Sequence, residues 1–112
     1  MSGEREQEGG GHVLRPQGRL DAGTAGVFRA EVRDLLDAGS RSLVVDMGGV
    51  SFLDSGGIVA IISSVRLVRK AGGDLRIARP SPQANMVLEL TSLNKVLPVH
   101  SSLEEALAAF NG

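Results

Sequence analysis

The sequence predicts an α/β fold: a single small domain in which about four α-helices pack against a mainly parallel, mixed β-sheet. Three observations support this class. Short apolar runs alternate with longer segments of helical periodicity, turn residues separate them, and the central strand, helix and strand have the spacing of a βαβ unit. The chain has 112 residues, of which 42% are hydrophobic, so one domain with an ordinary core is expected.

The N-terminal segment, residues 1–11, is polar, rich in glycine and without periodicity, so we expect a disordered tail. The folded domain is then expected over residues 12–112. Its first strand is predicted over residues 12–20, where apolar and polar residues are mixed. Pro16 cannot donate a backbone hydrogen bond, which favours an edge position or an interruption of this strand.

A first amphipathic helix is predicted from Thr24, a candidate N-cap, to about residue 38, with Gly39 as its end. Its apolar residues fall on one face: Val27, Phe28, Val32, Leu35 and Leu36. Its charged residues fall on the other: Arg29, Glu31, Arg33, Asp34 and Asp37. We therefore expect the first face to be buried on the sheet and the second to meet solvent.

The middle of the chain predicts the βαβ unit. Residues 42–47 form a short apolar run that is typical of a buried strand, a glycine turn follows, and a helix is predicted from about residue 55 to 71. The buried stripe of this helix comprises Ile58, Ile61, Ile62, Val65 and Val68. Two glycines end the helix, and residues 75–79 form the next predicted strand, which should be parallel to the first.

The C-terminal third predicts smaller elements. Pro82 is well placed at the start of a helix that runs to about residue 93. A last strand is predicted over residues 96–99. Ser102 and Glu105 have the spacing of a capping box, which indicates a terminal helix that extends to Phe110.

Composition excludes several classes of function. Lysine and arginine number 12 against 13 acidic residues, so no net charge draws the chain to nucleic acid or to an acidic membrane. Cysteine is absent, which excludes disulfides and thiolate metal sites. No apolar run is long enough to span a bilayer, and residues 1–12 lack the apolar core of a signal peptide. We expect a cytoplasmic protein that contacts neither membrane nor nucleic acid directly.

The most informative motif is Asp54-Ser55-Gly56-Gly57 at the start of the second predicted helix. Ser55 could simply be an N-cap, which is the usual role of a serine before a helix, and Asp54 is a second candidate for that role. Each glycine in a first helical turn costs up to about 1 kcal/mol relative to alanine, and a cap does not require that cost. The glycines instead favour close approach of another backbone to an accessible serine.

Two catalytic or metal interpretations of this region fail or remain weak. A nucleophilic serine needs a base held by a third group, and the only histidines, His12 and His100, lie near the two ends of the chain. Three aspartates at one edge of the sheet could supply oxygen ligands to a metal, but capping and strand-end roles explain them better: Asp21, Asp46 and Asp54.

Four arginines in the second half of the chain are expected to form a solvated face: Arg66, Arg69, Arg76 and Arg79. The sequence contains neither a phosphate-binding loop nor a dinucleotide fingerprint. We therefore expect no catalytic residue, no cofactor and no metal, and so no enzymatic activity.

Five segments in this order and spacing resemble a STAS domain of the anti-anti-sigma factor type, that is, an anti-sigma factor antagonist. The segments are residues 18–24 (GRLDAGT), 44–57 (VVDMGGVSFLDSGG), 72–76 (GGDLR), 88–93 (LELTSL) and 105–107 (EAL). The resemblance extends over about residues 13–110.

The resemblance implies a partner-switching protein in which Ser55 is the phosphate acceptor. It implies that the unphosphorylated form binds an anti-sigma factor with serine kinase activity and so frees a sigma factor, and that a metal-dependent serine phosphatase reverses the modification. The implied partner-binding residues are Asp21, Thr24, Asp54, Gly56 and Gly57. The family usually has serine or threonine where this chain has Gly56. The alternative is a STAS scaffold subunit of a stress-sensing or lipid-transport complex.

Overall fold

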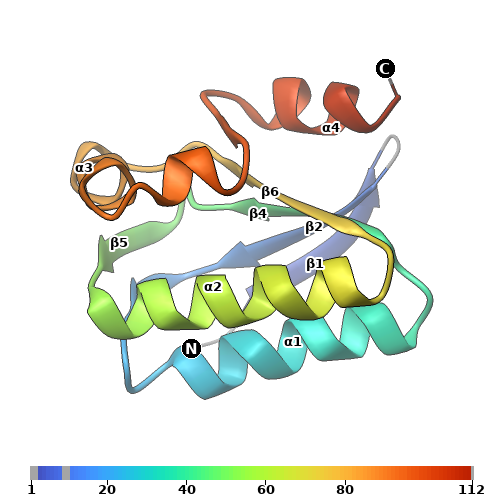
Figure 1. Ribbon diagram of the computed structural model, residues 1–112, viewed down its shortest axis with the longest axis horizontal. Coiled ribbons are helices and arrows are strands. Elements are labelled where there is room, and N and C mark those ends of the chain that lie inside the picture. Colours follow the sequence, from blue (N-terminus) through green and yellow to red (C-terminus); the bar gives the residue numbers. More distant parts are fainter. Residues whose placement is uncertain (1–2, 9–10, 112) are drawn as a thin grey trace.

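The computed structural model describes residues 3–8 and 11–111, and within them the chain forms an α/β domain (Figure 1). The strands are β1 (Gly3–Glu8), β2 (Gly11–Pro16), β3 (Gly18–Leu20), β4 (Ser42–Asp46), β5 (Val50–Leu53), β6 (Asp74–Ala78) and β7 (Val99–His100). The helices are α1 (Ala25–Asp37), α2 (Ser55–Lys70), α3 (Pro82–Leu90) and α4 (Leu103–Asn111), and a short 3₁₀ helix, η1, spans Leu93–Lys95. The predicted fold class is confirmed.

The main sheet has five strands in the order β1-β2-β4-β6-β7. Only β1 is antiparallel to its neighbour, and the other pairs are parallel. The predicted βαβ unit is confirmed, because β4 and β6 are adjacent and parallel with α2 between them in the chain. A second sheet consists of β3 and β5, which are also parallel.

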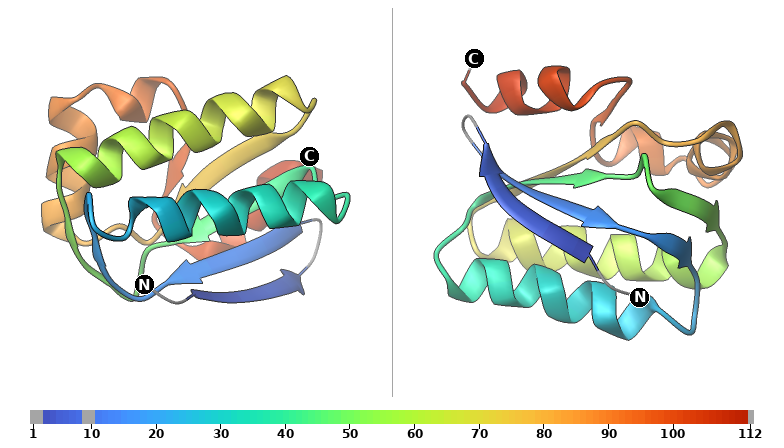
Figure 2. Two further views of the ribbon diagram at one scale, coloured as in Figure 1. Left: turned by 90° about the horizontal axis from the view of Figure 1, so that it is seen from below. Right: turned by 180° about the vertical axis from the view of Figure 1, so that it is seen from behind.

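Helices cover both faces of the main sheet. Figure 2 shows α1 and α2 on one face and α4 on the other. Successive strand residues point to opposite faces, so Leu43 and Val45 of β4 belong to the large core beneath α1 and α2, whereas Val44 belongs to a smaller cluster beneath α4. The central strand is therefore buried on both sides, as its continuous apolar run predicts.

The N-terminal segment differs from its prediction. Residues 3–8, which the sequence predicts to lie in a disordered tail, form β1 and pair antiparallel with β2. The register pairs Glu8 with Gly11, so two glycines in the sequence separate the paired residues, which is a known hairpin signal. An outer strand needs no apolar face of its own, because hydrogen bonds to its neighbour can hold it.

Two further strand predictions need correction. The strand predicted over residues 12–20 is interrupted at Gln17, and its two parts, β2 and β3, belong to different sheets. β2 is not an edge strand, since β1 and β4 flank it. Residues 50–53, predicted as part of a turn, form β5.

Helix α1 matches its predicted bounds, but two of its residues are misplaced in the prediction. Val27 is 42% exposed, whereas Glu31 is buried. In the C-terminal third, the helix that begins at Pro82 ends at Leu90, and η1 follows it. Ser102 caps the terminal helix as predicted, because its Oγ accepts a hydrogen bond from the N–H of Glu105 at 3.1 Å.

A buried carboxylate ties together the ends of three adjacent strands. Asp46 at the end of β4 is only 1% exposed. Its oxygens accept hydrogen bonds from Arg79 Nε at 2.8 Å and Nη2 at 2.9 Å, and from Arg15 Nε at 3.2 Å. The N–H of Gly48 also donates to Asp46, at 3.0 Å. A buried charge requires such partners, so Asp46 has a structural role.

These contacts set the protonation of Asp46. Burial disfavours the charged form of the carboxyl. The hydrogen bond from Arg79, the N–H of Gly48 and the charges of Arg79 and Arg15 outweigh that effect and hold the pKa of Asp46 below its ordinary value of 3.8. A carboxyl whose pKa is lower in the folded than in the unfolded state stabilises the fold above the unfolded-state pKa. This stabilisation is lost as the pH falls through the folded-state pKa.

We predict that Asp46→Asn lowers the free energy of unfolding by about 3 kcal/mol at pH 7, because it leaves two arginines without their buried partner. Urea unfolding at a series of pH values measures the difference from the parent. The difference should shrink as the pH falls below 3.8 and through the lower folded-state pKa of Asp46, because the parent carboxyl becomes protonated over that range. The control is Asp37→Asn on the exposed side of α1, which should change the free energy by less than about 0.5 kcal/mol. An equal effect of the two variants would contradict the structural role of Asp46.

Candidate functional site

The candidate site lies where the two strands of the small sheet end. β3 and β5 are parallel, with Arg19 paired to Phe52 and Leu20 paired to Leu53. A short turn follows β3 and leads into α1, and α2 begins two residues after β5. Parallel pairing therefore brings the N-termini of α1 and α2 to the same edge of the molecule, and with them the predicted site residues of both segments.

Asp54, and not Ser55, caps α2. The backbone of Asp54 is extended, and its Oδ1 accepts a hydrogen bond from the N–H of Gly57 at 3.1 Å. Ser55 is the first residue of the helix and is exposed, and its hydroxyl makes no hydrogen bond to any residue that the structure describes. The capping interpretation of Ser55 is wrong, and its hydroxyl is available to another molecule.

Asp21 organises the turn that precedes α1. Its Oδ1 accepts hydrogen bonds from the N–H groups of Gly23 at 3.0 Å and Thr24 at 3.2 Å. Its Oδ2 accepts from Arg19 Nε at 3.2 Å. The bond from Arg19 lowers the pKa of the Asp21 carboxyl, with the backbone and hydroxyl donors of the turn acting in the same direction and burial acting against them. Asp21 is therefore an anion at neutral pH.

Thr24 precedes α1 as predicted but does not cap it through its side chain. Its hydroxyl donates to the carbonyl oxygen of Arg19 at 3.0 Å and accepts from the N–H of Asp21 at 3.0 Å. These two hydrogen bonds of the Thr24 hydroxyl hold the turn before α1 against the end of β3.

The two glycines after Ser55 accommodate the chain's own backbone. A Cβ at Gly56 would overlap the main chain of Ala22, with the Ala22 Cα only 2.7 Å away. A Cβ at Gly57 would overlap the carbonyl oxygen of Leu20 and lie 2.6 Å from Leu53 Cδ1. The predicted close approach is real, but its source is the turn after β3. Gly57 is buried, so it cannot contact a partner directly.

Gln83 of α3 fastens the strand that leads to Ser55. Its Oε1 accepts from the N–H of Leu53 at 3.0 Å, and its Nε2 donates to the carbonyl of Leu53 at 2.7 Å. This side chain therefore bonds the outer edge of β5 as a neighbouring strand would. Sequence reasoning missed the residue, and no local signal could have identified it, because the partners are 30 positions apart.

Sequence reasoning also missed exposed residues beside the site. The guanidinium of Arg19 lies over the ring of Phe52, 4.4 Å from its centroid. Val59, one turn after Ser55, is 59% exposed. The sequence could have indicated this exposure, because Val59 lies outside the predicted buried stripe of α2.

The aspartates and histidines considered as metal ligands or as a catalytic base have other partners among the described residues. Among the described residues, no cluster of three or more histidine, aspartate and glutamate side chains could hold a metal ion. Asp46 is paired with arginines, whereas Asp21 and Asp54 bind backbone N–H groups. Of the histidines, His12 bonds Ser40 at 2.8 Å, and His100 lies 3.2 Å from Arg76 Nη1.

Three of the four arginines expected on a solvated face have specific contacts. Arg79 pairs with Asp46. Arg76 pairs with Asp74 at 3.2 Å and lies over the ring of Phe110, 5.1 Å from its centroid. Arg69 donates to the carbonyl oxygen of Val96. Arg66, Arg69 and Arg79 are nevertheless exposed, as expected, whereas Arg76 is half-buried.

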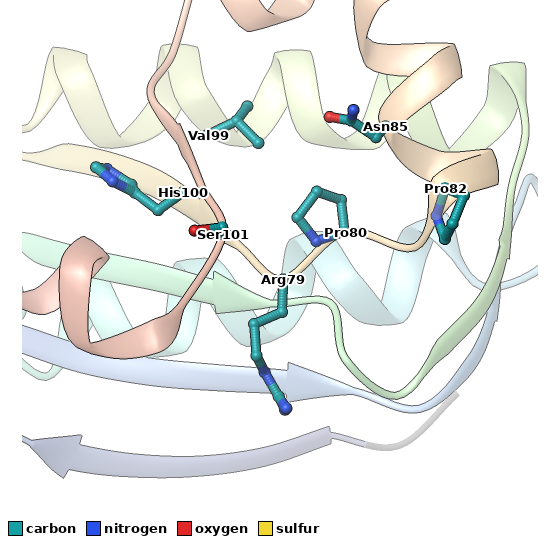
Figure 3. Close-up of a pocket in the computed structure, with 7 residues that line it drawn as sticks. All are labelled: Arg79, Pro80, Pro82, Asn85, Val99, His100 and Ser101. Carbon is teal, nitrogen blue, oxygen red and sulfur yellow. The ribbon is translucent and has the colours of Figure 1, made fainter.

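An open cleft of about 520 Å³ lies between α3 and β7, away from Ser55. Its lining includes Arg79, Asn85 and His100. Figure 3 shows that these polar side chains do not converge, because Arg79 points away from the cleft and His100 is directed to one side. The cleft therefore lacks the grouped polar atoms of a small-molecule site.

Comparisons with known proteins give a consistent result. A model of the STAS domain family matches residues 4–106. BtrV of Bordetella bronchiseptica, whose name describes it as a candidate anti-sigma factor antagonist, is 29% identical over 94 residues, which cover 84% of this chain and 81% of BtrV.

Among the described residues, no helix is both long and apolar enough to cross a membrane.

Solved structures share the fold. An anti-sigma factor antagonist from Mycobacterium paratuberculosis gives a TM-score of 0.89 at 24% identity, and the match covers 99% of this chain and 94% of that one. The Bacillus cell fate determinant SpoIIAA in its phosphorylated form gives a TM-score of 0.72 at 22% identity, and the match covers 96% and 98% of the two chains. At these identities the likeness establishes the fold.

We predict that Gly57→Ala lowers the free energy of unfolding by at least about 2 kcal/mol, because the methyl group overlaps a main-chain carbonyl that cannot rotate away. Gly26→Ala is the matched control. Gly26 is helical and exposed, and its added Cβ would meet nothing within 4 Å, so this variant should gain up to about 1 kcal/mol. Thermal and urea unfolding of both variants measure the difference, and a stable Gly57→Ala variant would contradict the packing described.

Proposed function

The chain belongs to the STAS domain family, and from that premise we propose that it is an anti-sigma factor antagonist controlled by phosphorylation of Ser55. The family match confirms the resemblance that the sequence motifs indicate. In this proposal the unphosphorylated protein binds an anti-sigma factor in the cytoplasm and so frees a sigma factor. That anti-sigma factor is also the serine kinase that modifies Ser55, and a metal-dependent phosphatase restores the binding form. The chain itself contributes regulation and no catalysis.

The accessible hydroxyl of Ser55 is the observation that carries the proposal. A capping serine would have to give up a hydrogen bond before it could accept a phosphate. Here Asp54 makes that bond, so the hydroxyl of Ser55 is exposed and without a partner among the described residues. Because Asp54 caps the helix, modification of the adjacent Ser55 removes no hydrogen bond of the cap, and this supports Ser55 as the phosphate acceptor.

A phosphate at this position is compatible with the fold. It adds about −1.5 to −2 charges at neutral pH. At the first residue of α2 this charge lies near the positive end of the helix dipole, where anions are favoured. The side chain is exposed, so no core packing needs to change. We therefore expect phosphorylation to leave the structure intact and to act on binding alone.

The same phosphate should weaken binding to the partner. Asp54 directly precedes Ser55, and Asp21, which is paired with Arg19, precedes Ala22, whose main chain lies against Gly56. Phosphorylation therefore adds negative charge to a surface that already carries carboxylates. A partner surface that fits closely over an unmodified serine must then accommodate and desolvate a dianion. A loss of about 3 to 4 kcal/mol corresponds to a 10²- to 10³-fold change in affinity.

We predict that Ser55→Ala binds the anti-sigma factor within about threefold of the parent and cannot be phosphorylated, whereas Ser55→Asp binds roughly 100-fold more weakly, which is about 2.7 kcal/mol. Titration calorimetry with the purified anti-sigma factor measures both. Ser101→Asp is the control, because it adds the same charge to an exposed serine near the N-terminus of a different helix. The hydroxyl of Ser101 donates to Glu105 in the parent, so thermal unfolding checks that this control remains folded. If Ser55→Asp bound as tightly as Ser101→Asp, the electrostatic switch would be wrong.

Phosphopeptide analysis of the protein from its native host tests the modification itself. We expect a single phosphate on Ser55 whose occupancy differs between growing and stressed cells. An unmodified Ser55 under every condition, in protein recovered as a stable part of a large assembly, would instead support a STAS scaffold subunit.

A further inference from the structure

One face of α2 carries a stripe of side chains that begins at Ser55 and is exposed except at Ile62, which is half-buried. Its members recur at helical spacing: Ser55, Val59, Ile62, Arg66 and Arg69. The stripe extends about 21 Å at a rise of 1.5 Å per residue. The surface that presents Ser55 therefore continues along one face of the helix and does not end at its first turn.

A groove of about 300 Å³ lies beside the far part of this stripe. Its lining residues are Ile62, Val65, Arg66, Arg69, Thr91, Leu93 and Val96. One wall belongs to α2 and the other to the segment after α3, which lies alongside α2 in Figure 1. Val65 and Leu93 are buried and form an apolar floor, whereas Val96 at the rim is 50% exposed.

The rim of the groove is basic. Arg66 is exposed and makes no ion pair with any described residue, and Lys70 and Lys95 are exposed nearby on α2 and η1. The side chain of Arg69 donates to the carbonyl oxygen of Val96 and so joins the two walls. None of the lining residues is acidic. An apolar floor beneath a cationic rim fits a segment that combines apolar anchors with carboxylates.

We propose that this groove receives an acidic, amphipathic segment of the same anti-sigma factor that meets Ser55. This inference rests on the proposed function. Ile62 lies about 10 Å along the helix from Ser55, so a protein docked over the serine reaches the groove on the same face. A specific interface buries roughly 800 Å² and about 20 to 30 residues on each partner, so it must extend beyond the turn around Ser55. The groove supplies the additional surface.

The two contacts should act independently. Arg66 lies about 16 Å along α2 from Ser55, beyond the Debye length of about 8 Å at physiological salt. The phosphate therefore does not neutralise the groove, and the groove does not attract the phosphate. The turn switches binding, and the groove selects which anti-sigma factor is bound.

We predict that Arg66→Glu weakens binding of the purified anti-sigma factor roughly tenfold at low salt, and that this loss shrinks as salt is raised. Arg33→Glu, an exposed charge reversal on α1, is the matched control and should leave affinity unchanged. Val96→Asp tests the opposite wall and should also weaken binding, and thermal unfolding checks that each variant remains folded. In the double variant with Ser55→Asp, measured at physiological salt, the two fold-changes should multiply.

A photo-reactive amino acid at position 66, compared with position 33, identifies the occupant. We expect position 66 alone to capture the anti-sigma factor, through a segment that contains acidic and apolar residues. Capture of a second copy of this chain, or unchanged affinity of both groove variants, would overturn the groove proposal even if Ser55→Asp still weakened binding. If no anti-sigma factor bound the unmodified parent, the proposed function would fail, and the groove proposal with it.

Discussion

The site depends on one close contact of main chain with main chain. The turn after β3 lies against the first turn of α2, and Gly56 and Gly57 leave room for it. A side chain at either glycine would force apart the ends of β3 and β5, and with them the starts of α1 and α2. Two glycines destabilise the first turn of α2, but they are required if this turn and the turn after β3 are to lie on one surface. Parallel pairing of the short strands, the bond from Thr24 to Arg19 and the clamp from Gln83 all hold this contact in place.

The site separates structural duties from regulatory ones at adjacent positions. Asp54 accepts a backbone hydrogen bond of α2, and Asp21 accepts backbone hydrogen bonds of the turn before α1. The hydroxyl of Ser55 bonds none of the described residues. A chemical change at Ser55 consequently alters the surface without removing a bond that the fold needs. Asp46 differs from Ser55 in this respect. Its charge is buried and is paired with Arg15 and Arg79 on the neighbouring strands, so a change at Asp46 would destabilise the sheet.

Local patterns in the sequence were sufficient for the helices, the buried strand β4, the fold class and the family. They were insufficient wherever the decisive partner was distant in the chain. The Gly56-Gly57 pair indicated a close backbone approach, but only the fold reveals that the approaching backbone is residues 20–22. The four residues of β5 are too few for a periodic signal, and they are held by β3 and Gln83. Two charged side chains expected in solvent, Arg76 and Glu31, are instead half-buried and buried by tertiary contacts.

The added strand β1 has a consequence for the behaviour of the protein at high concentration. Four of its six residues are charged, and it covers the edge of β2 that would otherwise offer unpaired backbone groups. At the other margin of the sheet, β7 has only two residues. Long, apolar and unpaired sheet edges are templates on which other chains add strands and aggregate. With a charged strand at one margin and a very short one at the other, this sheet disfavours β-pairing between neighbouring copies of the chain.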